Sequence, residues 1–198
     1  MKKALIILCI LLIPATIFAS GFGFRAGLAV KYDGNIGNIS SVISGSETIQ
    51  FPNDFGFGSD INVKFLFLDA DLTSYFGSDS DSHTVIDGLL SLNGGVNIAD
   101  LRLTAGLGVG YAYNFYSKEL HFKSLPEGTA ATFWDELKAT PINLRFGADI
   151  TFDKFNVALF SSYGTNLSLN SFKILEIFKD FNWRNMQVGV AFSYVFAK

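Results

Sequence analysis

The sequence has almost no cysteine, little histidine and few charged residues. Of its 198 residues, one is cysteine and two are histidine, and charged residues make up 17%. The single cysteine, Cys9, lies in an apolar N-terminal segment, so the rest of the chain has no thiol for a disulfide, a thiolate metal site or a cysteine nucleophile. These absences exclude the common cysteine-based enzymes and disulfide scaffolds.

Beyond its N-terminus the sequence also lacks a long apolar run. No later stretch reaches the roughly 18 uncharged apolar residues that a membrane-spanning helix requires. Yet 49% of the residues are hydrophobic, 21 are Phe and 19 are Gly, a composition that suits a membrane protein or a very apolar core. We expect one domain, and if that domain lies in a membrane it crosses as strands.

The N-terminus has the pattern of a secretory signal peptide. Lys2 and Lys3 form a basic region, residues 4–18 are apolar, and small residues follow from Ala19 to Gly21. We predict cleavage after Ala19, with Gly21 as the alternative, so that residues 1–19 are the signal peptide and residues 20–198 the mature domain.

The charge balance excludes a nucleic-acid partner. The formal net charge is −3, and loss of the two positive charges of Lys2 and Lys3 makes it −5. A nucleic-acid footprint needs a basic surplus, which this sequence does not have.

Eight segments of the sequence alternate between apolar and small or polar residues, which places successive side chains on opposite faces of a sheet. The clearest example sets Leu103 and Leu107 against Arg102 and Gly106. The pattern predicts eight strands. They are expected at residues 22–32, 55–67, 68–76, 86–98, 101–115, 142–152, 155–163 and 186–196.

The connections between these segments alternate between short and longer, as in outer-membrane barrels with short periplasmic turns and longer outer loops. A soluble β-sandwich or lipocalin-like barrel also alternates, but its second face must be well solvated. Here that face is rich in Gly, Ala and Ser, which suits a crowded interior. We therefore predict an all-β, eight-stranded antiparallel transmembrane up-and-down β-barrel with four outer loops, because a bilayer does not accept an open sheet edge.

The last segment carries a motif-like feature. Apolar and aromatic residues alternate there and end on an aromatic ring, as in the C-terminal signal that barrel-insertion machinery reads; they are Val190, Phe192, Tyr194 and Phe196. In this respect and in architecture the chain resembles the small eight-stranded outer-membrane barrels, the class of the OmpA transmembrane domain, OmpX and OmpW. Ala197 and Lys198 follow the final Phe, which departs from the usual ending.

The resemblance implies the outer membrane of a Gram-negative-type bacterium, with membrane lipid as a partner and insertion machinery as a partner during biogenesis. An eight-stranded barrel has an interior just wide enough for its own side chains. The expected inward charges are five of each sign, Arg25, Lys31, Lys64, Arg102 and Arg145 against Asp60, Asp69, Asp71, Asp87 and Asp149. Unpaired charges would be costly there, so the balance predicts a paired network that plugs the lumen. The alternative is an ion or proton path through the same residues.

The last loop has the spacing of a short amphipathic helix, with apolar positions at Phe172, Leu175, Phe178 and Phe181. We expect it to pack on the barrel rim or the outer-leaflet surface. A lid for a hydrophobic small molecule is the alternative that the resemblance to OmpW implies. The loops could also bind an extracellular ligand, whose identity the residues do not reveal.

Enzymes that modify lipid A also use eight-stranded barrels, so a catalytic triad has to be considered. The two histidines, His83 and His121, both fall in expected outer loops, and residues 79–83 read Asp-Ser-Asp-Ser-His. Adjacency in sequence is not triad geometry, and Asp79 with Asp81 lacks the ligand count of a calcium loop. We predict no catalytic residue, no metal site and no cofactor.

Three functions therefore stay open, in this order. The first is a non-enzymatic structural or surface-interaction scaffold with a plugged lumen. The second is a narrow OmpW-like channel for small or hydrophobic solutes. The third is a lipid A-modifying enzyme.

Overall fold

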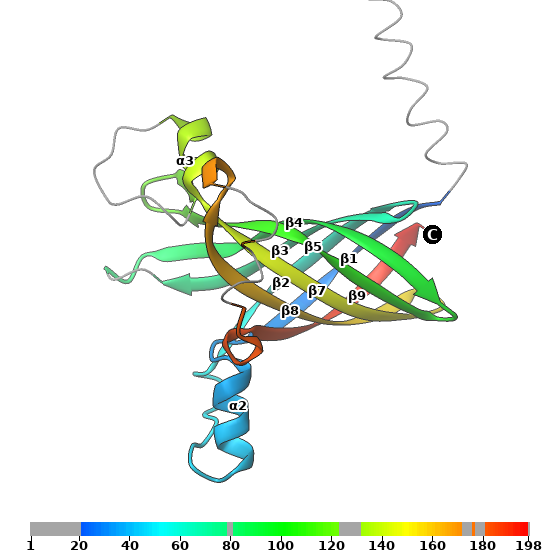
Figure 1. Cartoon of the computed structure of the whole chain (residues 1–198), viewed down its shortest axis with the longest axis horizontal. Coiled ribbons are helices and arrows are strands. Elements are labelled where there is room, and N and C mark those ends of the chain that lie inside the picture. The colour runs from blue at the N-terminus through cyan, green and yellow to red at the C-terminus, as the bar shows by residue number, and fades with distance from the viewer. Residues whose placement is uncertain (1–20, 79–80, 123–131, 172–175, 177–180, 198) are drawn as a thin grey trace, which may run out of the picture.

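The structure is a computed structural model and describes residues 21–78, 81–122, 132–171, 176 and 181–197 (Figure 1). The predicted signal peptide lies outside these residues. Eight long strands make up most of the described chain. They are β1 (Phe22–Tyr32), β2 (Phe55–Phe65), β3 (Leu68–Ser78), β4 (Thr84–Ile98), β5 (Leu101–Asn114), β7 (Pro141–Phe152), β8 (Phe155–Ser168) and β9 (Gln187–Ala197).

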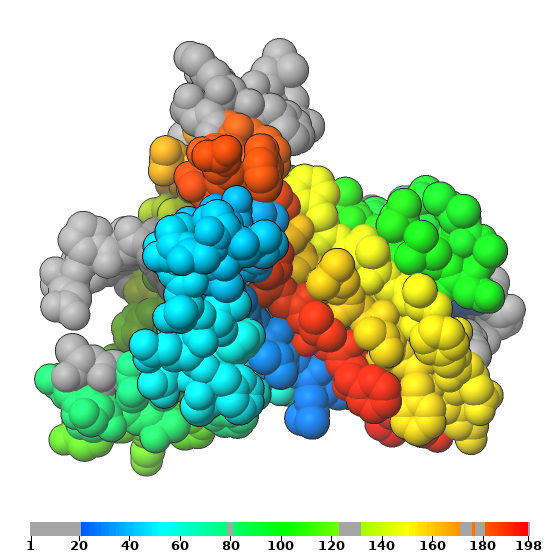
Figure 2. All heavy atoms as spheres, turned by 90° about the horizontal axis from the view of Figure 1, so that it is seen from below, coloured from blue at the N-terminus to red at the C-terminus, as the bar shows by residue number. Residues whose placement is uncertain are grey.

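The strands close into a barrel. Each long strand pairs antiparallel with the next along the chain, and β1 pairs with β9, so the last strand completes the wall beside the first. Figure 2 shows β9 (red) running obliquely between β1 (blue) and β8 (yellow). Closure leaves none of the eight strands as a bare edge, which is the condition for a sheet in hydrocarbon. The predicted eight-stranded up-and-down barrel is confirmed.

Three two-residue turns join strands at the end of the barrel where both β1 begins and β9 ends (Figure 1). Their first residues, Leu66, Ala99 and Asp153, have φ of 56°, 53° and 52°. Positive φ at this position belongs to the primed turns, whose twist matches that of the flanking strands. The longer connections all lie at the other end, as predicted.

Those longer connections contain structure that the alternation did not predict. The first holds helix α2 (Ile36–Ile43), and the third holds a short strand, β6 (Glu119–Phe122), and helix α3 (Phe133–Ala139). Each helix begins at a capping box, set by Asn35 and by Thr132. The fourth holds two 3-10 turns, η1 (Leu169–Ser171) and η2 (Trp183–Asn185). The two-residue alternation predicts strands alone, so it did not reveal α2, β6 or α3.

The distribution of side chains is the reverse of a soluble protein. On β4, Leu92 is 59% exposed, whereas the next residue, Asn93, is 1% exposed. Exposed apolar residues cover the outer wall around the barrel, among them Leu28, Phe57, Ile61, Val63, Leu90, Val96, Leu103, Leu107, Ile150, Val157, Leu159, Val190 and Phe192. Because the apolar face points outward, the soluble-barrel alternative is excluded for this chain.

None of the described helices is long and apolar enough to span a membrane.

The outward apolar face gives a depth-dependent prediction. Leu92→Arg, near the middle of β4, should lower the free energy of unfolding of the barrel in lipid vesicles by about 2–4 kcal/mol, because a cation is costly at the bilayer midplane. Ile98→Arg, on the same face at the turn end of β4, is the matched control and should cost only about 0–1 kcal/mol. Urea titration of the refolded protein measures both. Equal costs at the two depths would contradict a hydrocarbon environment.

Candidate functional site in the barrel lumen

The ten charged residues predicted to face inward all lie on the lumen face of the strands. Strand alternation places them there because their apolar neighbours take the outer wall. Nine of them take part in the ion pairs described below. Lys64 is half-buried and makes no ion pair within the described residues.

A cross-lumen contact joins opposite walls of the barrel. The Arg25 Nη1 atom on β1 lies 2.8 Å from Asp149 Oδ1 on β7, and its Nη2 atom lies 4.0 Å from Asp71 Oδ1 on β3. Neither β3 nor β7 neighbours β1 in the sheet, so the guanidinium bridges the lumen itself. Both carboxylates are almost fully buried.

Asparagine side chains complete the coordination of these two carboxylates. Asn62 Nδ2 and Asn93 Nδ2 donate to the two oxygens of Asp71 at 2.7 and 2.5 Å. Asn156 Nδ2 donates to Asp149 Oδ1 at 2.8 Å. The alternation places the three asparagines on the inward face, but only the strand register shows which carboxylate each one meets.

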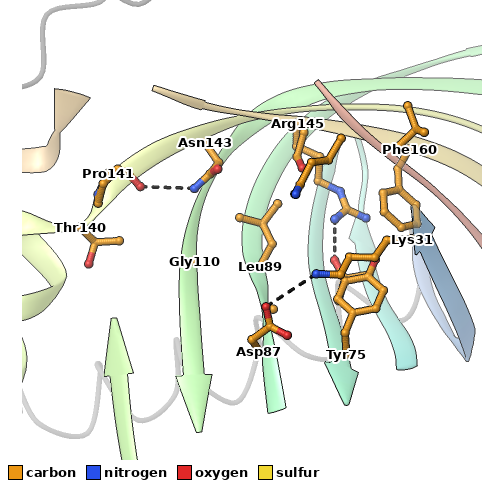
Figure 3. Close-up of a pocket in the computed structure, with 15 residues that line it drawn as sticks. Lys31, Tyr75, Asp87, Leu89, Gly110, Thr140, Pro141, Asn143, Arg145 and Phe160 are labelled. Carbon is orange, nitrogen blue, oxygen red and sulfur yellow. Dashed lines mark hydrogen bonds and ion pairs between the residues drawn. The ribbon is translucent and has the colours of Figure 1, made fainter. Parts of the chain in front are cut away.

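A second arginine lies nearer the loop end of the lumen. Arg145 Nη1 donates to Thr73 Oγ1 at 2.6 Å, and Nη2 lies 3.6 Å from Asp60 Oδ1. Its guanidinium stacks on the Phe160 ring, 4.7 Å from the centroid (Figure 3). Gly189 makes room for that ring, because a Cβ there would lie 2.6 Å from Phe160 Cε2.

Each end of the lumen has its own ion pair. Toward the loops, Lys31 Nζ lies 3.7 Å from Asp87 Oδ2 and 4.8 Å from the centre of the Tyr75 ring (Figure 3). Toward the chain termini, Arg102 Nε and Nη2 donate to Asp69 Oδ2 at 3.0 and 2.5 Å. The paired charged residues thus lie at successive levels along the barrel axis.

The lumen contains two separate cavities, one toward each end of the barrel. The cavity of 260 Å³ near the loops is lined by Lys31, Tyr75 and Arg145, among others. The cavity of 310 Å³ at the other end is lined by residues that include Arg25 and Arg102, and the two share no lining residue. Apart from Thr165, the buried polar side chains that line neither cavity lie between the two, at what we call the middle level; they are Asp60, Asp71, Ser91, Asn93, Asn156 and Ser193.

Comparison with known proteins finds similarity in structure alone. No protein-family model matches the chain, and no curated protein is significantly similar to it. The Neisserial surface protein A (NspA) is 14% identical, with 89% of this chain and 96% of that chain covered and a TM-score of 0.43. The N-terminal β-barrel domain of Pseudomonas aeruginosa OprF is 13% identical, with 89% and 98% covered and a TM-score of 0.43.

The residues of the predicted insertion signal lie on β9. Val190, Phe192 and Tyr194 are exposed on the outer wall, and Phe155 of β8 contacts the last two at 5.6 and 5.8 Å between ring centroids. Phe196 packs against Tyr194 at 4.9 Å. Recognition of this strand by insertion machinery stays a prediction.

The predicted apolar loop helix falls mostly outside the described residues. Phe172, Leu175 and Phe178 are not described, whereas Phe181 lies against the Tyr163 ring, 5.0 Å between centroids.

The two histidines lie in different loops. The His83 ring stacks on Tyr116 at 4.2 Å, and His121 lies between Glu119 at 3.2 Å and Glu136 at 3.8 Å. Asp79 and Ser80 lie outside the described residues, and no group of three or more potential metal ligands is found in the part that is described.

The cross-lumen pair gives a double-mutant prediction. Asp149→Ala should lower the free energy of unfolding in lipid vesicles by about 3–5 kcal/mol, because it leaves the largely buried Arg25 charge without its nearest partner. The double variant Arg25→Met, Asp149→Leu should be more stable than the single variant, because it removes both charges. Urea titration of the refolded barrel measures both, and equal destabilisation would show that the loss is one of packing.

Proposed function

We propose that the protein is a non-enzymatic outer-membrane barrel of a Gram-negative-type bacterium. In this proposal the barrel is a scaffold with a lumen closed by paired charges, and it presents four loops to the exterior. The outward apolar wall supports the membrane location. The buried polar side chains between the two cavities, with the Arg25–Asp149 ion pair next to them, are the observation that carries the closed-lumen function.

The interactions of these polar residues favour a closed lumen. Arg25, Asp71 and Asp149 are held by direct ion pairs and by amide donors. A water-filled path would have to separate these groups, and a buried charge that loses its partner is strongly destabilising. The level therefore acts as a stable plug of the lumen.

The loops are the surface on which a scaffold would meet its partners. The Asp33 N–H donates to the Asp54 carbonyl at 2.9 Å, which draws together the ends of the first loop. The third loop carries β6 and α3. An extracellular ligand on this surface belongs to the proposal.

A narrow channel for small or hydrophobic solutes is the second candidate. The two cavities favour it, because a single level of side chains separates them. Among the described residues, no contact favours the third hypothesis, a lipid A-modifying enzyme.

Conductance in planar lipid bilayers distinguishes the scaffold from the channel. The refolded protein should show no steady discrete openings, because the buried polar level fills the lumen. The double variant Arg25→Ala, Arg145→Ala removes the two long side chains from the plug and should show openings. The single variant Arg145→Ala removes only one of these two side chains and serves as an intermediate between the unmodified protein and the double variant.

Steady openings of the unmodified protein, with a selectivity that changes in Arg145→Ala, would overturn the closed-lumen proposal in favour of the channel. Folding of every variant is verified beforehand by the mobility difference between heated and unheated protein in detergent gels.

If the protein is a scaffold, the barrel should also fold without the part of the first loop that contains helix α2. Replacing residues 35–53 with a short glycine–serine turn should change the free energy of unfolding in vesicles by no more than about 1 kcal/mol, because loop length has a weak effect on closure entropy. Urea titration measures the effect. A barrel that fails to fold after this change would show that the first loop belongs to the structural core.

A further inference from the structure

Near the loop end of the barrel, β5 and β7 stop pairing with each other. The β5–β7 ladder ends at the pair Val109 and Ile142, and beyond it β5 pairs with β6 instead. Helix α3 ends two residues before β7 begins, and it contacts both β6 and η1. A helix therefore continues the wall where strand pairing stops (Figure 1).

A chain of aromatic rings leads from the outer wall onto this helix. Tyr111 lies on the outer face, where its hydroxyl is 2.5 Å from Ser74 Oγ, and its pairing partner on β6, Phe122, shares that face. The Phe122 ring contacts Phe133 at 5.2 Å, and Phe133 contacts Trp134 at 5.3 Å. We call Phe122, Phe133 and Trp134 the aromatic patch of α3.

The aromatic patch becomes more exposed along its length. Phe122 is 9% exposed, Phe133 is 48% exposed and Trp134 is 64% exposed. The outer two rings are thus about half exposed or more, and through Phe122 they connect to Tyr111 on the outer wall.

Helix α3 turns a polar side toward the mouth of the barrel. Glu136 lies 3.8 Å from His121 Nδ1, and His121 is paired with Ala112 on the face of β5 and β6 opposite to Phe122. Lys138 stands one turn beyond Trp134, so it lies on the same side of the helix as the Trp134 ring and not on the side of Glu136. The helix is therefore amphipathic, with its apolar side directed away from the mouth.

We propose that α3 is an interfacial segment that rests in the outer leaflet, with Phe133 and Trp134 inserted at the boundary between headgroups and acyl chains. Lipid is the occupant because the aromatic patch is continuous with the apolar wall. Trp prefers this boundary, and a neighbouring Lys can reach a lipid phosphate. The proposal rests on the membrane location proposed above.

The two tryptophans of the chain, Trp134 and Trp183, make a direct test possible. The variant Trp183→Phe leaves Trp134 as the sole reporter and is refolded into dioleoylphosphatidylcholine vesicles, with or without brominated phosphatidylcholine. Bromine should reduce the Trp134 emission about two-fold or more, because an interfacial ring lies about 5–10 Å into the headgroup and acyl boundary. Aqueous iodide should quench it weakly.

Two controls use chains in which both tryptophans are replaced by Phe. Leu92→Trp reports on the outer wall of β4 and should be quenched by the brominated lipid. Asp81→Trp reports on the connection between β3 and β4, which extends furthest along the strand direction, and should be quenched by iodide alone (Figure 1).

The two controls distinguish failure of the inference about α3 from failure of the proposed membrane location. If Leu92→Trp is quenched by brominated lipid and Trp134 only by iodide, α3 stands in water and the inference is overturned. If neither is quenched by brominated lipid, the membrane location itself is wrong. Shielding of Trp134 from both quenchers would also overturn the inference, because it would place the ring against protein.

Discussion

The pairing of β1 with β9 is the constraint on which the rest of the structure depends. Without it the sheet would have two bare edges, and backbone groups in hydrocarbon have no water to satisfy them. Closure with eight strands then sets the width of the barrel, which leaves room for side chains but little more. The polar residues that the outer wall cannot accept are thereby forced into one narrow space.

The narrow lumen explains why charges and amides occur together there. Arg25 has to cross from β1 to Asp149 on the far wall, and Asp71 needs donors from both Asn62 and Asn93. Each of these three charges is tolerated because another strand supplies its partner. In the proposed function, the same groups that make the lumen polar also close it, so a polar interior is not by itself a sign of a water-filled channel.

The strands could be predicted from the sequence because alternation is local and the barrel strands have an apolar face directed outward. The inward position of Arg25 or Asp149 follows from the same alternation. Their contact across the barrel does not, because it depends on closure and on the register of strands far apart in the sequence. Helix α3 was missed for another reason, since its seven residues are stabilised by the Thr132 cap and by contacts with β6 and η1 rather than by a long periodic pattern.

The two ends of the barrel obey different physical limits. At the end with the chain termini, two-residue turns such as Asp153–Lys154 have backbone angles dictated by the twist of their strands. At the other end the ladder already holds the strand ends in place, as the Asp33–Asp54 hydrogen bond shows for the first loop. Sequence there is free to build helices, caps and aromatic contacts without disturbing the wall. Any specific recognition by this protein is therefore best sought at the loop end, where side chains are not already committed to the closed sheet or to its plug.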